Sequence, residues 1–309
     1  QLRVRPLPAA ARPRHRDARE VLRRVLCGRH RPGHHRPRRR QVAFGVRRRA
    51  RRGVPRDGVP RDAAADAGKG DKWVVAINST FPPFESVKEG TKDYQGVDID
   101  IAHYIAKKMN KKIEFTDMKF ASLVPTLQSG RADVIISAIS PTSEREKVVS
   151  FSKPYYFPMK AILCKKGAGY DAMDKLKGKK AGASMGTTYA KELKAVGGIE
   201  VVEMDTTPLV VQDIKNGRLA AGLFDSSQAA VFVKQNPDLE LHVLQGTVVK
   251  DDTFAIALPK GSKDVEKINE ILKEMRTNGE LHKILVAHLG EEGTKEYEAA
   301  IEKLDIAKL

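Results

Sequence analysis

The pattern of apolar and polar positions becomes regular only after residue 70, where it predicts an alternation of strands and helices. Residues 73–77 and 112–115 have the apolar content of short strands, and residues 99–109 carry apolar side chains at helical spacing between them. A short helix beginning at Leu123 leads into an apolar strand at 133–139. Strands that alternate with helices in this way predict a mainly parallel sheet covered by helices.

A second series of the same kind begins near Ala161. Its short apolar runs predict strands, and its longer segments with helical spacing predict helices, with room for a break at Asn278-Gly279. A charged helical tail is expected at the end of the chain. The expected strands are 161–165, 180–183, 200–203, 220–224 and 253–258, the expected helices are 189–195, 209–216 and 265–289, and the tail is 291–309.

Residues 1–70 differ from the rest of the chain in pattern and in charge. They hold 22 basic and 5 acidic residues, which accounts for the whole net charge of +17, because the remaining residues hold 34 of each sign. Their apolar residues follow neither a helical nor a strand period. Repelling charges and little apolar surface predict a disordered segment without an evolved role. The alternatives are a nucleic-acid-binding arm, which a single aromatic residue (Phe44) disfavours, or a segment that is not native to the protein.

The two cysteines, Cys27 and Cys164, indicate neither a disulfide framework nor a metal-ligand spacing, so we expect no metal site. Cys164 lies in the apolar run 161–164 and is expected to be a small buried hydrophobic residue. No run of 18 apolar residues predicts a transmembrane helix, and the first residues do not have the pattern of a signal peptide. The motifs that indicate a function all lie after residue 70.

The stretch 137–145 carries the most informative chemistry of the chain. It follows the apolar residues 133–136 and contains small residues, hydroxyls and a proline, so the chain is expected to turn there and expose backbone N–H groups. The guanidinium of Arg145 beside such a turn is suited to hold a carboxylate through two parallel hydrogen bonds. The alternative is a solvated loop in which Arg145 pairs with Glu144 or Glu146.

Five further motifs precede and follow this stretch along the chain. Three of them come before it and two come after it, and a set of motifs in one order is more specific than any single motif. The motifs are TFPPFE at 80–85, QGVDID at 95–100, FASLVP at 120–125, GTTY at 186–189 and LFD at 223–225.

Taken together, these stretches resemble the polar amino-acid-binding proteins of bacterial ABC importers, a family of two-lobed periplasmic solute-binding proteins. The resemblance covers about residues 71–290 and does not extend to residues 1–70. It implies an α/β type II periplasmic-binding-protein fold, with a ligand cleft between the lobes and a two-segment hinge near 158–161 and 249–253. The implied domains are 71–158 plus 253–290 for lobe 1, 159–252 for lobe 2, 291–309 for the tail and 1–70 for the disordered segment.

Polar residues directly after apparent strands are candidates for one cleft, because ligands of open α/β sheets bind beyond the carboxyl ends of the strands. The resemblance implies that Arg145 binds the α-carboxylate of an amino acid and that Asp225 binds its α-ammonium. Asp225 also opens a predicted helix, so a helix N-cap is its alternative role. The candidate ligand-binding residues are Asn78, Phe81, Glu85, Phe120, Ser137, Ala138, Ser140, Arg145, Ser184, Thr187, Thr188 and Asp225.

The sequence leaves the specificity for the ligand side chain open. Phe81 and Phe120 match family positions where aromatic rings sandwich the side chain, although either could be core packing. Asn78 stands where some relatives that bind cationic amino acids carry a carboxylate. Its amide leaves arginine or glutamine open and weakens the case for lysine, while Glu85 is near enough in sequence to supply a missing charge, although an exposed loop is its default.

The resemblance implies an extracytoplasmic receptor that closes around a polar L-amino acid of the arginine, lysine or glutamine class and delivers it to an importer. Such a receptor would be a monomer, periplasmic or lipid-anchored outside the cell, with a permease as its partner and without a cofactor or a catalytic residue. The alternative is an enzyme on the same fold that resembles cyclohexadienyl dehydratases. That reaction needs a general acid in the cleft, for which Glu85 is the candidate. A nucleic-acid partner would rest on residues 1–70 alone.

Overall fold

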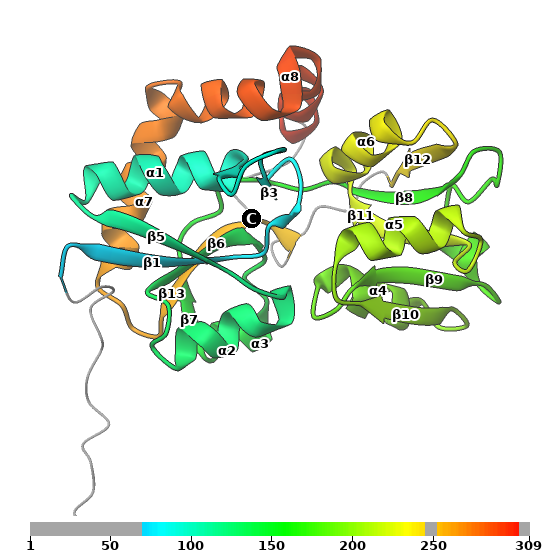
Figure 1. The fold of residues 1–309 in the computed structure, drawn as a ribbon, viewed down its shortest axis with the longest axis horizontal. Coiled ribbons are helices and arrows are strands. Elements are labelled where there is room, and N and C mark those ends of the chain that lie inside the picture. The colour runs from blue at the N-terminus through cyan, green and yellow to red at the C-terminus, as the bar shows by residue number, and fades with distance from the viewer. Residues whose placement is uncertain (1–69, 245–251, 303–309) are drawn as a thin grey trace, which may run out of the picture. The chain divides into compact units, whose positions relative to one another are not determined.

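The computed structural model describes residues 70–244 and 252–302, and these residues form two five-stranded sheets with helices on both faces of each (Figure 1). The expected disordered segment lies outside the described residues except for Gly70, and so does most of the second expected crossover. Among the described residues, no helix combines the length and the apolar character that crossing a membrane requires.

The first sheet has the strand order β5-β1-β6-β13-β7. Strand β1 pairs in parallel with β5 and β6, whereas β13 is antiparallel to both β6 and β7. Strand β13 therefore joins a sheet whose other strands lie more than a hundred positions earlier in the chain. The strands are β1 (Lys72–Ile77), β5 (Lys112–Asp117), β6 (Val134–Ile139), β7 (Val149–Phe151) and β13 (Ala255–Pro259).

Successive side chains of the first sheet enter two different hydrophobic cores, because side chains alternate between the faces of a strand. Val75 and Ile77 pack toward helices α1, α7 and α8, whereas Ala76 packs toward α2. The apolar runs at the centre of the sheet are thus buried on both sides. The helices of this lobe are α1 (Val97–Lys108), η1 (Phe120–Ser122), α2 (Leu123–Gln128), α3 (Ser143–Glu146), α7 (Asp264–Thr277) and α8 (Glu280–Ile301).

A small three-stranded sheet precedes helix α1. In this region the backbone of Phe84 passes close to the start of the helix. Gly96 is the N-cap of α1 with φ of 134°, and a Cβ atom there would lie 2.1 Å from the carbonyl oxygen of Phe84. This approach of two backbones requires glycine. The strands are β2 (Thr80–Phe81), β3 (Glu85–Val87) and β4 (Tyr94–Gln95).

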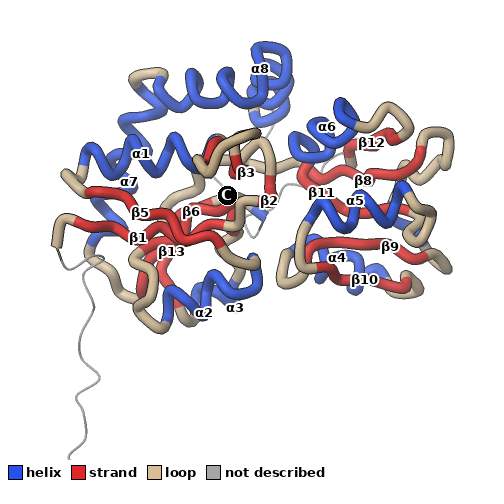
Figure 2. The backbone as a smooth tube through the Cα atoms, viewed as in Figure 1, coloured by secondary structure: helices blue, strands red, loops and turns tan. Residues whose placement is uncertain are grey.

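The second sheet has the strand order β10-β9-β11-β8-β12 and repeats the design of the first (Figure 2). Strand β9 pairs in parallel with β10 and β11, and β8 is antiparallel to β11 and β12. The strands are β8 (Lys160–Lys165), β9 (Lys180–Ser184), β10 (Glu200–Met204), β11 (Ala221–Asp225) and β12 (Leu239–Val243).

Two hydrophobic cores also cover the two faces of the second sheet. Leu163 packs with residues of α5 and α6, and its neighbours Ile162 and Cys164 pack with residues of η2 and α4. Cys164 is fully buried, as expected of a small hydrophobic residue. The helices are η2 (Met173–Leu176), α4 (Thr188–Val196), α5 (Thr207–Lys215) and α6 (Ser226–Gln235).

Both sheets are mixed, so the expectation of a mainly parallel sheet is wrong in this respect. The parallel pairs come from the strand–helix alternation that the sequence shows. The antiparallel pairs come from β7, β8, β12 and β13, which lie next to the two places where the chain passes between the sheets. A short strand that returns from another sheet carries no sign of its direction in its own sequence.

The two crossover segments lie side by side. Tyr156 and Phe254 form an antiparallel bridge, and Lys160, at the start of β8, places its ammonium 2.7 Å from the Asp252 carboxylate and 2.8 Å from that of Glu192 in α4. Lys160 and Asp252 are both buried. Tyr297 of α8 stacks on Tyr156 with ring centroids 4.3 Å apart, so the last described helix also packs against the first crossover.

Candidate ligand-binding site

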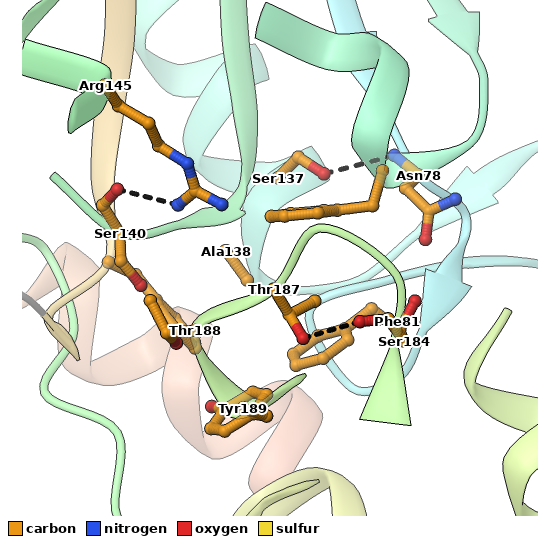
Figure 3. Close-up of a pocket in the computed structure, with 12 residues that line it drawn as sticks. Asn78, Phe81, Ser137, Ala138, Ser140, Arg145, Ser184, Thr187, Thr188 and Tyr189 are labelled. Carbon is orange, nitrogen blue, oxygen red and sulfur yellow. Dashed lines mark hydrogen bonds between the residues drawn. The ribbon is translucent and has the colours of Figure 1, made fainter. Parts of the chain in front are cut away.

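A pocket lies where residues of both lobes meet (Figure 3). Ten of its twelve lining residues were expected from the sequence, and two were not, Tyr189 and Phe254. Arg145 is the one charged residue in this lining of described residues. The lining consists of Asn78, Phe81, Phe120, Ser137, Ala138, Ser140, Arg145, Ser184, Thr187, Thr188, Tyr189 and Phe254.

The guanidinium of Arg145 is held in place by groups from both lobes. Its Nη1 donates to the carbonyl oxygen of Ser140 at 2.8 Å, and its Nη2 donates to that of Gly186 at 2.9 Å. The ring of Phe120 lies under it, with the guanidinium carbon 5.3 Å from the ring centroid. Burial lowers the pKa of Arg145 to about 10, although the charge of Glu144 opposes this shift, so the guanidinium is charged at neutral pH. Such a charge favours an anionic ligand.

The alternative in which Arg145 pairs with an acidic neighbour on a solvated loop does not describe its contacts. Glu144 instead forms an ion pair with Lys191, across the pocket on α4. The N-cap of α3 is Thr142, whose hydroxyl accepts a hydrogen bond from the backbone N–H of Arg145. This cap fixes the backbone from which the guanidinium reaches the pocket.

The turn after β6 is shaped by a buried carboxylate below it. Ala138 has φ of 42°, which is uncommon for a residue with a side chain. Its N–H donates to Asp98 Oδ2 at 2.6 Å, and the hydroxyl of Tyr155 donates to Asp98 Oδ1 at 2.7 Å. Burial raises the pKa of Asp98 to about 7, and these two hydrogen bonds oppose the shift. Asp98 therefore holds the backbone of the pocket without lining the pocket itself.

Glu85 lies beside this turn and not in the lining of the pocket. The Ser137 hydroxyl donates to Glu85 Oε1 and accepts from the backbone N–H of Asn78 at 3.1 Å. Burial, and then the charge of Asp98, raises the pKa of Glu85 well above its usual value, while the hydrogen bond from Ser137 opposes this. The structure thus buries the residue for which an exposed loop was the default.

The Asn78 side chain is also engaged by its surroundings. Its amide nitrogen donates to the carbonyl oxygen of Met118 at 2.7 Å, and its amide oxygen accepts from the Thr80 hydroxyl at 2.8 Å. These bonds fix the orientation of the amide at the pocket wall. Asn78 therefore offers a ligand a neutral polar edge that is already oriented.

The wall from the second lobe is the start of helix α4. Thr187 caps this helix, accepting from the N–H of Ala190 at 3.3 Å and donating to the carbonyl oxygen of Ser184 at 2.6 Å. Gly186 has φ of 80°, and a Cβ atom there would lie 3.2 Å from Ala121 of the first lobe. The helix N-terminus, with Thr188 beside it, presents a positive electrostatic end to the pocket.

Asp225 is fully buried and is not among the residues that line the pocket. It caps helix α6 by accepting from the N–H of Gln228 at 3.0 Å, so the expected alternative role is present. Its other oxygen, Oδ2, is buried without a hydrogen-bond partner among the described residues, as is the hydroxyl of Tyr189. Burial raises the pKa of Asp225 to about 7, although nearby backbone N–H groups oppose this shift. The pKa of Tyr189 is raised as well, first by burial and then by the charge of Asp225.

The two lining residues that were not expected had weak signals in the sequence. Tyr189 ends the GTTY motif and, when considered alone, is the second residue of a helix. Phe254 stands at the second crossover and contacts the ring of Phe81, with centroids 6.2 Å apart. Neither position stands out by composition or spacing. Only the fold identifies these two residues as part of the pocket.

Comparisons with known proteins agree with this architecture. A family model of bacterial extracellular solute-binding proteins, family 3, matches residues 73–291. The arginine-binding extracellular protein ArtP of Bacillus subtilis (strain 168) is 34% identical over 226 residues, covering 72% of this chain and 88% of ArtP. A probable histidine-binding protein of Neisseria gonorrhoeae is 31% identical over 242 residues, covering 76% of this chain and 90% of that protein. The solved structure of an ancestral arginine-binding protein bound to glutamine matches with a TM-score of 0.68 and 37% identity, covering 72% of this chain and 100% of that one.

Two α/β lobes with a pocket where they meet are typical of a solute-binding protein. With the family model matched over most of the chain, the protein belongs to the bacterial extracellular solute-binding proteins, family 3. The family and the two-lobed fold predicted from the motifs are thereby confirmed. The relatives named above are binding proteins, and the Bacillus relative is an extracellular one.

Proposed function

We propose that this chain is the receptor of an ABC importer and binds a polar L-amino acid, arginine or glutamine by class, between its lobes. The position of Arg145 is the observation that carries the proposal. Carbonyl oxygens of described residues engage two of its N–H groups, and a guanidinium has five. The remaining donors suit an α-carboxylate, with the N-terminus of α4 on the opposite wall.

The α-ammonium of the ligand would pair with Asp225. The buried Oδ2 of this residue lacks a hydrogen-bond partner among the described residues, and a desolvated cation needs an opposite charge. The charge of Asp225 helps to raise the pKa of the Tyr189 hydroxyl, so the two groups are neighbours, and we propose that the ammonium reaches Asp225 along the Tyr189 ring. The capping bond to Gln228 would keep the carboxylate in place during this contact.

The ligand side chain would lie between Phe81 and Phe120, against Asn78. The described lining holds no carboxylate, so a compact ammonium such as that of lysine would lose its hydration without a counter-charge. A guanidinium is more weakly hydrated and stacks on aromatic rings, and an amide needs no counter-charge. This supports arginine or glutamine over lysine.

Binding would be coupled to closure of the lobes, because only a closed form brings both walls to one ligand. Cross-lobe contacts such as Arg145 to Gly186 and Lys191 to Glu144 support such a form. We place the receptor outside the cytoplasm, in a periplasm or lipid-anchored, where it acts as a monomer and presents the ligand to its permease.

Thermal unfolding of the full chain, measured against each common L-amino acid, tests this proposal. A ligand at a hundredfold excess over its Kd stabilises the folded state by about 2.7 kcal/mol. The midpoint should rise by roughly 5–10 °C with arginine or glutamine and less with lysine. If no amino acid raises the midpoint, the amino-acid assignment is wrong.

The dehydratase alternative is less well supported by the geometry. Its candidate acid, Glu85, has a raised pKa but lies outside the pocket lining with one oxygen on Ser137. Incubation of the chain with prephenate distinguishes the two functions. Release of phenylpyruvate would establish the enzyme, and no release together with an amino-acid shift would establish the receptor.

A further inference from the structure

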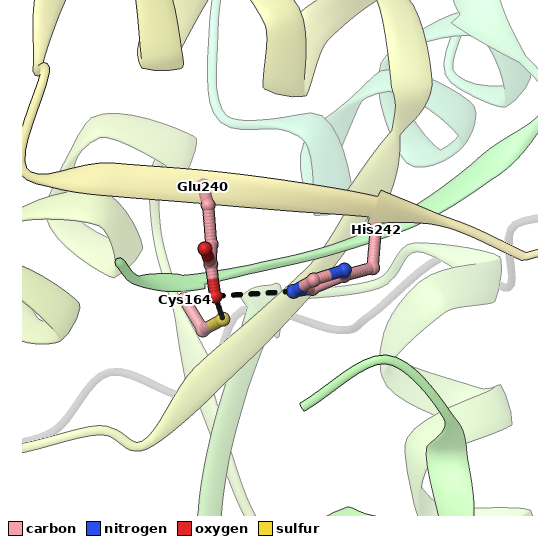
Figure 4. A group of neighbouring side chains, drawn as sticks. All are labelled: Cys164, Glu240 and His242. Carbon is pink, nitrogen blue, oxygen red and sulfur yellow. Dashed lines mark hydrogen bonds and ion pairs between the residues drawn. The ribbon is translucent and has the colours of Figure 1, made fainter. Parts of the chain in front are cut away.

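Three side chains of different donor chemistry converge on one face of the second sheet, and none of them lines the ligand pocket (Figure 4). Glu240 of β12 stands directly opposite Cys164 of β8 in the antiparallel register. His242 is two residues further along β12 and therefore shares this face. The antiparallel pairing alone thus brings a thiol, a carboxylate and an imidazole together.

The distances among these groups match those within a small coordination sphere. The Cys164 Sγ lies 3.8 Å from Glu240 Oε1, and His242 Nε2 lies 3.2 Å from the same oxygen. All three candidate ligand atoms lie within 4.8 Å of one another. With zinc–ligand bonds of 2.0–2.3 Å in tetrahedral geometry, ligand atoms lie about 3.3–3.8 Å apart. Small side-chain shifts would therefore admit an ion between them.

The burial of the three side chains leaves the cluster open to solvent on one side. Cys164 is fully buried, whereas the side chains of Glu240 and His242 are 26% and 30% exposed. An ion could thus enter from the solvent side and keep a water molecule as its fourth ligand.

We propose that Cys164, Glu240 and His242 bind a zinc ion. One sulfur, one imidazole nitrogen and one carboxylate oxygen form a borderline donor set that suits Zn²⁺ better than Mg²⁺ or Ca²⁺, which prefer oxygen alone. Binding requires the thiolate, so the thiol proton would be released to solvent and the affinity would rise with pH. Without metal, the three groups remain a hydrogen-bonded cluster.

The zinc site would link the two strands of lobe 2 that lie next to the crossover segments. Strand β8 is the first element after one crossover, and β12 is the last described element before the other. A metal bound by both would join these strands more firmly than their backbone hydrogen bonds do alone. Zinc should therefore stabilise lobe 2 independently of the amino acid.

Cobalt absorption in the full chain tests the site directly. The other thiol, Cys27, is removed by Cys27→Ser, so that a thiolate-to-cobalt band can arise only from Cys164. Histidines outside the cluster, including those in residues 1–69, can bind cobalt but cannot produce this band. We expect one equivalent of Co²⁺ to give the band and visible tetrahedral absorption, and Zn²⁺ to abolish both.

Two variants and a matched control decide the ligand set. His242→Gln and Glu240→Gln, each in the Cys27→Ser background, should weaken Co²⁺ binding by more than the roughly 10- to 100-fold typical of outer-shell changes. His282→Gln, which alters an exposed histidine paired with Glu298, should leave it unchanged. Absence of the band, or equal affinity in all variants, would overturn the proposal. Cys164→Ser should abolish the band, with its fold checked by the midpoint shift that an amino-acid ligand gives.

Discussion

The two walls of the pocket differ in how completely their polar groups are satisfied. On the first lobe, Arg145 donates a hydrogen bond to a carbonyl oxygen of its own lobe and lies over the ring of Phe120. The turn before Arg145 is fixed by a hydrogen bond to Asp98. On the second lobe, the buried Asp225 Oδ2 and Tyr189 hydroxyl lack partners among the described residues. The first wall is therefore prepared to bind an anion before closure. The second wall has the most to gain when a ligand supplies a cation, because unpaired buried polar groups are destabilising.

Replacing Arg145 by alanine should have the largest effect on this comparison. The change removes the single charge in the described pocket lining and leaves a buried carboxylate of the ligand unpaired. We expect affinity to fall more than a hundredfold, corresponding to about 3 kcal/mol or more. Isothermal titration with the best amino acid measures this, with circular dichroism as the control for folding. An affinity within threefold of the wild type would contradict the assignment of the first wall.

Replacing Asp225 by asparagine should have the next largest effect and should change the pH dependence. Its pKa is raised to about 7, so protonation removes the partner of the ammonium as pH falls below that value. Affinity should decrease about tenfold per pH unit below pH 7, since binding then releases one proton. Asp225→Asn should cost roughly thirtyfold at pH 8 and abolish the slope.

The same titration tests the competing source of a pH effect. Asp98 also has a pKa raised to about 7, by burial, and it supports the first wall. A slope that persists in Asp225→Asn would assign the effect to Asp98 and would contradict our reading of the second wall. Equal losses for an amino acid and its deaminated analogue would do the same.

Replacing Gly186 by alanine tests how closely the walls must approach. The residue has φ of 80°, where a Cβ is strained by about 1 kcal/mol, and its Cβ would press on Ala121 of the other lobe. Affinity should fall about tenfold. The measurement is titration, with Gly178→Ala as the matched control, since Gly178 has φ of 76° and open space around it. Equal losses of affinity in both variants would show that strain, and not lobe approach, causes the effect.

Replacing Lys191 by alanine should have the smallest effect. Its ion pair with Glu144 joins the lobes, but the side chains are 56% and 69% exposed, so solvent screens the interaction. We expect less than a threefold loss of affinity and a faster ligand release in stopped-flow measurements. A loss as large as that of Asp225→Asn would mean that surface charges contribute as much as the pocket does.

The difference between the walls also explains what the sequence could predict. Arg145 and the turn before it were predictable because one strand, one turn and one arginine are local features. Asp225 was expected to be a ligand partner or a helix cap. The capping bond is a local feature and is observed, whereas the unpaired second oxygen depends on packing against other elements. Glu85 was expected near the cleft because it follows Phe81 closely. Glu85 is turned inward by the short hairpin of β2 and β3 beneath Ser137. This hairpin has no clear pattern in the sequence.

Residues brought together by strand register were not predictable at all. Cys164, Glu240 and His242 have no metal-ligand spacing along the chain, and we expected no metal site. Strand β12 was not among the expected elements. Only its antiparallel pairing with β8 places these three residues on one face. Local motifs therefore identified the pocket, whereas sites made by distant strands required the structure.

The buried ion pair between Lys160 and Asp252 has a consequence for how this chain can change during evolution. It joins the two crossover segments. Removal of Lys160 would leave the Asp252 carboxylate buried without its counter-charge, whereas removal of Asp252 would leave Lys160 paired with Glu192 alone. A substitution of Lys160 should therefore persist only with a matching substitution of Asp252. Across descendants of this sequence, the two positions should vary as a pair, although more than ninety residues of chain separate them.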